Sequence, residues 1–157
     1  MIATALSAWA SQAQALRFEA IATVYAWAPQ ARLPHPLLAL RATPDAPAQF
    51  VFDRGQLGGP RGLLAFVVSA SEGSRDALQA AVLAQGQAEL AALGVPPLQA
   101  VLTVVEKRAT FACLPGLVRP PQTIAPGLLA AGDYVQGPYP ATLEGAVRSG
   151  WAAGSRA

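Results

Sequence analysis

Residues 128–151 constrain the fold most. They contain a short apolar run, then a Gly-Asp corner, then a segment that predicts a helix with small residues on one face. The run at 128–131 is short enough for a buried strand, and Gly132 and Asp133 end it. After a turn rich in Gly and Pro, residues 141–153 predict a helix. Glycine lets a backbone approach a ligand closely, and the free N–H groups at a helix start favour a phosphate or a developing anion.

Hydrophobic periodicity predicts the other elements and an α+β fold class. We expect a small antiparallel or mixed sheet that carries one helix. The strand at 18–28 is apolar on both faces, which is typical of an interior strand. The middle of the chain predicts an antiparallel meander, because turn signals recur between its short apolar runs. The predicted helices are residues 2–16 and one that Ser74 begins and Gly94 ends, and the main predicted strands are 18–28, 49–52, 63–69 and 98–106, with 107–111 extending or bending the last.

Composition excludes several classes of protein. The chain of 157 residues is 53% hydrophobic and 13% charged, so we expect that much of its surface is apolar or meets something else. Its net charge of +2 comes from scattered arginines with one lysine, which gives no support for nucleic-acid binding. No apolar run approaches the ~20 residues that span a bilayer, and no signal peptide is recognisable. We expect a cytoplasmic protein, with peripheral membrane contact left open.

The single cysteine and the single histidine limit the chemistry further. Cys113 cannot form an intramolecular disulfide, which indicates a reducing compartment. No zinc site is expected, because such a site needs about four ligands and Cys113 and His35 are the only cysteine and histidine in the sequence. We expect Cys113 to be a small apolar residue packed in a core.

The stretch AGDY…GPYPATLEGAVRSG resembles the C-terminal flavin-contacting segment of FAD-dependent desaturases and amine oxidases, phytoene desaturases included. The segments LPHPLLAL, QFVFDRGQL, VVEKRATFACLPG and RPPQT are similar to the squalene-associated branch, the hydroxysqualene dehydroxylases. The resemblance implies that residues 1–127 are a substrate-domain portion and residues 128–157 the C-terminal strand and helix of an FAD-binding domain. No GxGxxG fingerprint is present, so we expect a fragment whose N-terminal FAD-binding half lies outside this chain.

The same resemblance implies a set of cofactor-binding residues. Gly132 and Asp133 would contact the sugar-phosphate portion of FAD; alternatively, Asp133 caps its own turn. The start of the following helix would face the pyrimidine edge of the flavin ring, mainly through its backbone, or would serve packing alone. These helix residues are Ala141, Thr142, Leu143 and Ala146.

Four aromatic residues on predicted strands could line an apolar tunnel for an isoprenoid, or belong to the core. They are Tyr25, Trp27, Phe50 and Phe52. Lys107 and Arg108 could neutralise a phosphate or form a solvated strand end. No catalytic residue or general base is identified.

Several functions stay open. The resemblance implies an FAD-dependent oxidoreductase that converts hydroxysqualene to squalene. A phytoene-type (carotenoid) desaturase or an amine-oxidase-like flavoenzyme is the alternative within the enzyme class. A non-catalytic truncated product or an apolar binding module is the alternative outside it. Because the strand at 128–131 would lack its neighbours and expose unpaired N–H and C=O groups, we expect the isolated chain to be poorly soluble, or to associate with itself or with the missing half.

Overall fold

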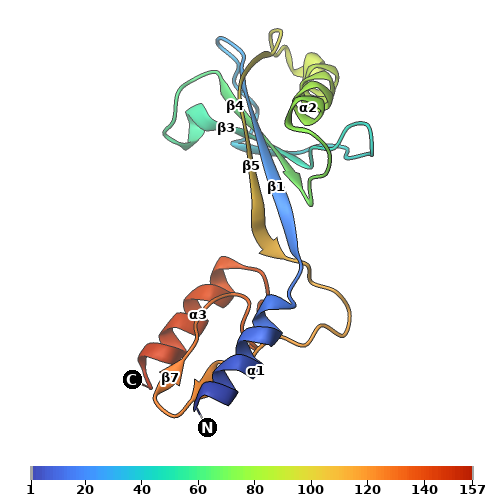
Figure 1. The fold of residues 1–157 in the computed structure, drawn as a ribbon. Helices are drawn as coiled ribbons and strands as arrows, with labels where there is room; N and C mark the ends of the chain where they lie inside the picture. Colours follow the sequence, from blue (N-terminus) through green and yellow to red (C-terminus); the bar gives the residue numbers. More distant parts are fainter. Residues whose placement is uncertain (1, 157) are drawn as a thin grey trace. The chain divides into compact units, whose positions relative to one another are not determined.

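The computed structural model describes residues 2–156 and confirms the α+β class (Figure 1). Contacts divide the chain into two compact units. One is Glu19–Ala109, and the other joins Met1–Phe18 with Thr110–Ala157. Each unit is described by itself below. Among the described residues, no helix is both long enough and apolar enough to cross a membrane.

The unit Glu19–Ala109 is built on a five-stranded antiparallel sheet with the order β2-β3-β4-β1-β5. The predicted meander is confirmed, because β2, β3 and β4 are consecutive antiparallel neighbours. The predicted interior position of β1 is also confirmed, since β1 lies between β4 and β5. The strands are β1 (Phe18–Trp27), β2 (Leu37–Ala39), β3 (Phe50–Asp53), β4 (Leu63–Ser69) and β5 (Gln99–Phe111).

Helix α2 (Arg75–Leu90) packs on one face of this sheet and closes the core. It begins as predicted, since the Ser74 hydroxyl oxygen accepts a hydrogen bond from the Ala77 N–H at 3.2 Å. A 3₁₀ turn, η2 (Ala91–Leu93), extends the helix to Gly94, whose φ of 71° ends it as predicted. The core cluster between helix and sheet includes Val24, Val51, Leu64, Phe66, Leu78, Val82 and Leu90.

The second unit contains three elements from the end of the chain and one from its start. They are α1 (Ile2–Gln14), β6 (Thr123–Ala125), β7 (Leu128–Leu129) and α3 (Leu143–Gly154). Trp9 of α1 holds this unit together, because its indole N–H donates to the Pro121 carbonyl at 2.7 Å. The Trp9 ring also meets the Tyr134 ring edge-on, with centroids 6.2 Å apart.

Two expectations differ from the structure. The strand predicted at 128–131 is only β7, which pairs with β6 across a turn at Gly127 (φ 75°), so it has a neighbour within this chain. Cys113 is exposed rather than packed in a core. Residues 110–127 belong to the same compact unit as the C-terminal segment. The reason is that β6 and the Pro121 carbonyl lie in that stretch and bind β7 and α1.

Candidate functional site

Arg119 shapes the loop that follows β7. Its guanidinium group donates hydrogen bonds to three backbone carbonyls, those of Asp133 (3.3 Å), Val135 (2.7 Å) and Gly137. The same group lies over the Phe111 ring, 5.9 Å from its centroid. Since a guanidinium carries several donors in a rigid plane, one side chain fixes three points of the loop.

Gly132 occupies a position that only glycine fills easily. Its φ of 155° lies outside the region that other residues adopt, and a Cβ atom there would collide with the Tyr134 ring. The Gly132 N–H donates to the Ser149 hydroxyl oxygen of α3 at 3.1 Å. The Gln122 side chain donates to the Ser149 carbonyl at 2.8 Å. The Gly-Asp corner is therefore held against the side of α3.

Thr142 caps the start of α3. Its hydroxyl oxygen accepts from the Gly145 N–H at 3.0 Å, and the hydroxyl donates to the Tyr139 carbonyl at 2.7 Å. No partner for the N–H of Leu143 or Glu144 occurs among residues 2–156. Two donors at the positive end of the helix dipole are thus available to an acceptor.

A pocket of ≈ 190 Å³ lies between the Gly-Asp loop and one side of α3. It brings together two predicted cofactor residues, Gly132 and Asp133, but not the four predicted on the helix start. Of those four, Leu143 is 87% exposed, and Ala141, Thr142 and Ala146 do not line the pocket. The pocket residues that the sequence did not predict are Gln122, Val135, Gln136, Gly137, Pro138, Gly145, Arg148, Ser149 and Ala152.

The Asp133 carboxylate has no hydrogen-bond or ion-pair partner in the described part of the chain. This observation gives no support to the alternative in which Asp133 caps its own turn. Arg148, the cation lining the same pocket, is engaged elsewhere, because it pairs with Glu144 and lies 4.9 Å from the centroid of the Tyr139 ring. Hydrogen bonding to Glu144 raises the pKa of Arg148. The pocket therefore offers a free acceptor to a ligand that carries hydroxyl or N–H groups.

Gly145 sets how closely α3 approaches the loop before it. Gly145 is buried, and a Cβ atom there would collide with the Tyr139 carbonyl oxygen. Gly150, on the same helix, is exposed, and a Cβ atom there would have nothing within 4 Å. These two glycines form a matched pair for testing the packing of the site.

We expect Gly145→Ala to lower the free energy of unfolding by about 1–3 kcal/mol through overpacking. Gly150→Ala is expected to raise it by about 0.5–1 kcal/mol, because alanine favours an exposed helix interior. Urea denaturation followed by circular dichroism measures both. Equal effects of the two substitutions would contradict the close approach at Gly145.

The four aromatic residues predicted to line a tunnel lie on one face of the five-stranded sheet. Tyr25 pairs with Ala65, and Ala65 pairs with Phe52, so these side chains share a face. Phe50 and Trp27 have the same parity on their strands and lie on that face too. The core with α2 is on the opposite face, and Phe50 is exposed. We call this aromatic surface the outer face.

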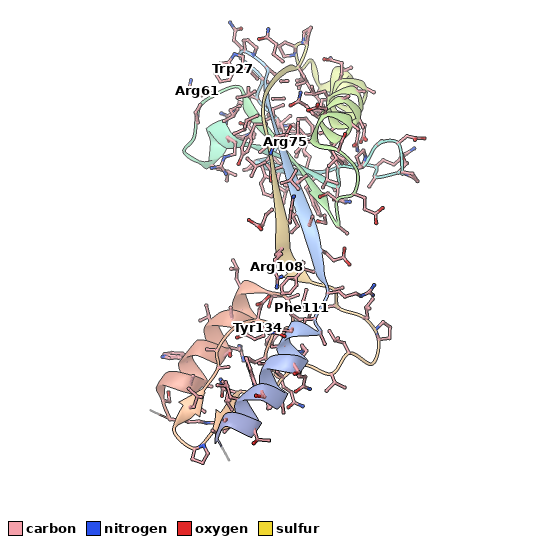
Figure 2. All side chains as sticks on the ribbon, in the orientation of Figure 1. Trp27, Arg61, Arg75, Arg108, Phe111 and Tyr134 are labelled. Atoms are coloured by element: carbon pink, nitrogen blue, oxygen red, sulfur yellow. The ribbon has the colours of Figure 1, made fainter. Side chains whose placement is uncertain are left out.

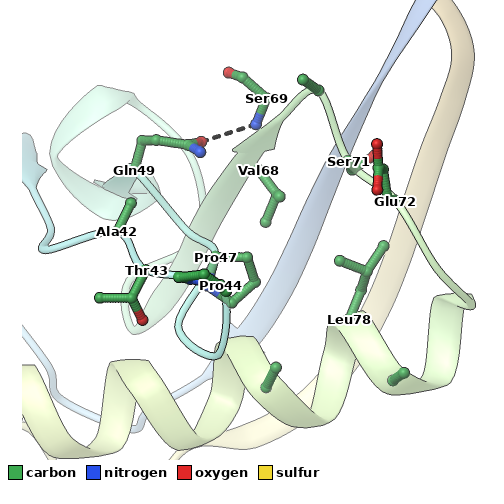
Figure 3. A pocket seen from close by; sticks show the side chains of 13 residues that line it. Ala42, Thr43, Pro44, Pro47, Gln49, Val68, Ser69, Ser71, Glu72 and Leu78 are labelled. Carbon is green, nitrogen blue, oxygen red and sulfur yellow. Dashed lines mark hydrogen bonds between the residues drawn. The ribbon is translucent and has the colours of Figure 1, made fainter.

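Two larger cavities lie in the unit Glu19–Ala109. The one in Figure 3, ≈ 650 Å³, is lined mainly by small and apolar residues near Pro44 and Leu78, and the Ser69 N–H donates to the Gln49 side chain there at 2.8 Å. The other, ≈ 350 Å³, includes Arg32, Arg61 and the buried Asp53. Neither contains a predicted site residue. Within residues 2–156, no group of His, Cys, Asp and Glu side chains could hold a metal ion.

Lys107 and Arg108, the other predicted phosphate contacts, are exposed on β5. The Arg108 N–H donates to the Glu106 carboxylate at 3.1 Å, and neither side chain lines the pocket beside Asp133. The site therefore consists of the Gly-Asp loop, its Arg119 support and α3. Comparisons of the chain with protein-family models and with curated proteins find no match.

Proposed function

We propose that this chain supplies the flavin-ring side of an FAD-dependent oxidoreductase that acts on a long isoprenoid. The observation that carries the proposal is the unpartnered Asp133 carboxylate in the pocket beside α3. A half-buried carboxylate without a partner is costly unless solvent or a ligand satisfies it. The hydroxyl groups of the FAD ribityl chain are donors of the required kind.

Each part of the site has a role in this proposal. Asp133 accepts hydrogen bonds from the ribityl hydroxyls, and Gly132 lets the loop backbone come close. The free N–H groups of Leu143 and Glu144 stabilise negative charge at the pyrimidine edge of the ring. Arg119 positions the loop through its three carbonyl contacts.

FAD, when bound and reduced, would supply hydride; in the squalene-associated branch the hydroxyl of hydroxysqualene leaves with a proton as water, and the hydride takes its place to give squalene. The outer face of the sheet, with Tyr25, Trp27, Phe50 and Phe52, offers an apolar surface for such a chain of isoprene units. An isoprenoid that lay on it would bury the apolar side that faces the sheet.

The outward side of α3 supports a missing half. Leu143, Val147 and Trp151 recur at a spacing of four residues and form an apolar stripe, and Leu143 and Trp151 are 87% and 79% exposed. Large apolar side chains in such a row are typical of a surface that another domain covers. We therefore place the dinucleotide-binding part of the enzyme against this stripe.

We expect the chain alone not to retain FAD during purification, because it has no GxGxxG segment to bind the FAD pyrophosphate.

With the dinucleotide-binding part present, Asp133→Ala should weaken FAD binding about ten- to a hundred-fold, because one hydrogen bond to a charged group is lost. Asp133→Asn should be milder, since one oxygen acceptor remains. Asp45→Ala, at an exposed turn of the other unit, is the control. Flavin titration measures affinity, and thermal melting of the apo-protein reports the fold.

An unchanged FAD affinity in Asp133→Ala would remove the assignment of this residue. A chain that purified with stoichiometric FAD by itself would contradict the missing half. Product analysis with hydroxysqualene and with phytoene distinguishes the squalene-associated activity from the desaturase alternative.

The exposed outer face favours a second candidate, an apolar binding module without flavin chemistry. In that case the chain binds squalene with no flavin present, and Asp133→Ala leaves this binding unchanged. Binding of radiolabelled squalene to the flavin-free chain and its Asp133→Ala variant tests this candidate.

A further inference from the structure

The five-stranded sheet has two very different edges. At one edge is β2, which is only three residues long, and at the other is β5, which runs for 13 residues from Gln99 to Phe111. In the described part of the chain, no strand pairs with the outer side of β5. Natural sheets usually shorten, charge or cover such an edge, because its unpaired N–H and C=O groups bind other strands.

The two halves of β5 differ in their side chains. Its second half is protected by three consecutive charges, from Glu106 to Arg108. Its first half carries Val101, Leu102 and Val104, which are 56%, 53% and 47% exposed. No charge interrupts residues 99–105. This first half therefore has the features of a strand that pairs with another chain.

The sequence of β5 is self-complementary in one register. In an antiparallel sheet, residues directly opposite each other point to the same face. A two-fold axis perpendicular to a continuous sheet therefore lies between the two copies of one residue, which face each other. We name each register by that residue. An axis at Thr103 places Leu102 opposite Val104 of the second copy, and Val101 opposite Val105. Because of the two-fold symmetry, each of these two apolar pairs occurs twice in the dimer. Gln99 then lies opposite Lys107 of the second copy, and no like charges meet.

Registers shifted toward the charged second half of β5 are worse. An axis at Val105 places Leu102 opposite Arg108 and Val104 opposite Glu106, so exposed apolar side chains meet charges. An axis at Lys107 places that lysine opposite itself, which is unfavourable.

We propose that β5 is a self-pairing edge through which two copies of this chain join their sheets, antiparallel and with the two-fold axis at Thr103. The pairing satisfies the backbone groups of the open edge and covers Val101, Leu102 and Val104 from the side. The pairing also continues the outer face from one copy into the other. The Thr103 hydroxyl contacts Gln79 of α2 at 2.9 Å, so Thr103 points to the face that α2 covers. Leu102 and Val104, its neighbours on the strand, therefore point to the outer face. The proposal requires no flavin and is independent of the proposed function.

Sedimentation velocity of the full chain over a range of concentrations tests it. We expect a monomer–dimer equilibrium in the wild type. Leu102→Lys and Val104→Lys should each raise the dimer dissociation constant about tenfold or more, since each substitution acts twice in the symmetric dimer. Val118→Lys is the matched control, because Val118 is 71% exposed but lies outside the strand. Circular dichroism confirms that each variant is folded.

A charge-pair experiment tests the register. One chain carries Leu102→Lys with Val104→Glu, and a control chain carries Leu102→Lys with Val104→Lys. The first should still dimerise, because each introduced lysine then faces an introduced glutamate of the second copy across the axis at Thr103, whereas an axis at Leu102 or at Val104 would bring like charges together. The control chain should be monomeric, and a monomeric first chain would overturn the register. A monomeric wild type, or a dimer that both single lysine variants leave intact, would overturn the proposal.

Discussion

Phe66→Ala is expected to lower the free energy of unfolding by about 3–5 kcal/mol, a large part of the roughly 5–15 kcal/mol of a whole domain. Phe66 is fully buried in the cluster between the sheet and α2. Its removal loses the transfer free energy of the ring and leaves a cavity that the sheet cannot close. Equilibrium urea denaturation measures the loss. Phe50→Ala, on the exposed outer face, is the control and should cost much less.

The partner of this ring is Gly86 on α2. A Cβ atom at Gly86 would lie 2.6 Å from Cζ of Phe66 and 2.8 Å from Cδ1 of Leu98, so the helix approaches the sheet only because this residue is glycine. Gly86→Ala alone should cost about 1–3 kcal/mol through overpacking. In a Phe66→Ala background the methyl group has room, so the double substitution should cost less than the sum. Strict additivity would contradict the contact (Figure 2 draws all the side chains on the ribbon).

Asp53→Ala is expected to have the second large effect. The carboxylate is 1% exposed and accepts hydrogen bonds from Leu33 N–H (3.0 Å), Gly55 N–H (3.0 Å) and the Gln56 side chain (2.7 Å). Removal of the shared acceptor leaves the Leu33 donor buried without a partner. One lost hydrogen bond to a charged group is worth about 1.5–3 kcal/mol, and several are lost here. Asp53→Asn should cost less, because one oxygen remains.

The same carboxylate makes stability depend on pH. Burial raises the pKa of Asp53, but hydrogen bonds from Gln56, Leu33 and Gly55 outweigh it and hold the pKa below its ordinary value. Stability from this group is therefore present above the unfolded pKa of about 3.9 and is lost as pH falls through the lower folded value. The free energy of unfolding measured between neutral and acid pH should fall less steeply in Asp53→Asn. An identical pH profile would contradict the ionised carboxylate.

Local chemistry in the sequence was enough to predict most elements. β4 was predicted at residues 63–69, where it is found, because it is a continuous apolar run between turn residues. Ser74 and Gly94 marked the start and end of the α2 region through a cap and a left-handed terminator, which are properties of single residues. The interior place of β1 followed from apolar residues on both of its faces.

Long-range contacts could not be predicted in this way. Gln85 lies at a polar position of α2, yet its side chain is buried and binds the Ala48 backbone at 2.8 and 2.9 Å. Nothing in the helical pattern marks a partner that is 37 residues away. The apolar run at 128–131 predicted a four-residue strand, but only two of these residues form β7. The sequence also did not reveal the partner of β7, which is β6 on the other side of Gly127.

For the candidate site, the sequence by itself determined the Gly-Asp corner and a helix that follows it, but not the Thr142 cap before α3. The corner is a local feature, set by a glycine and a carboxylate next to each other in the chain. Only the tertiary structure decided that Arg119 and Gln122 support the corner and that the Asp133 carboxylate has no partner among the described residues. The physical reason is that a hydrogen-bond partner 14 or 27 residues away is chosen by packing, and packing leaves no periodic signal in the sequence.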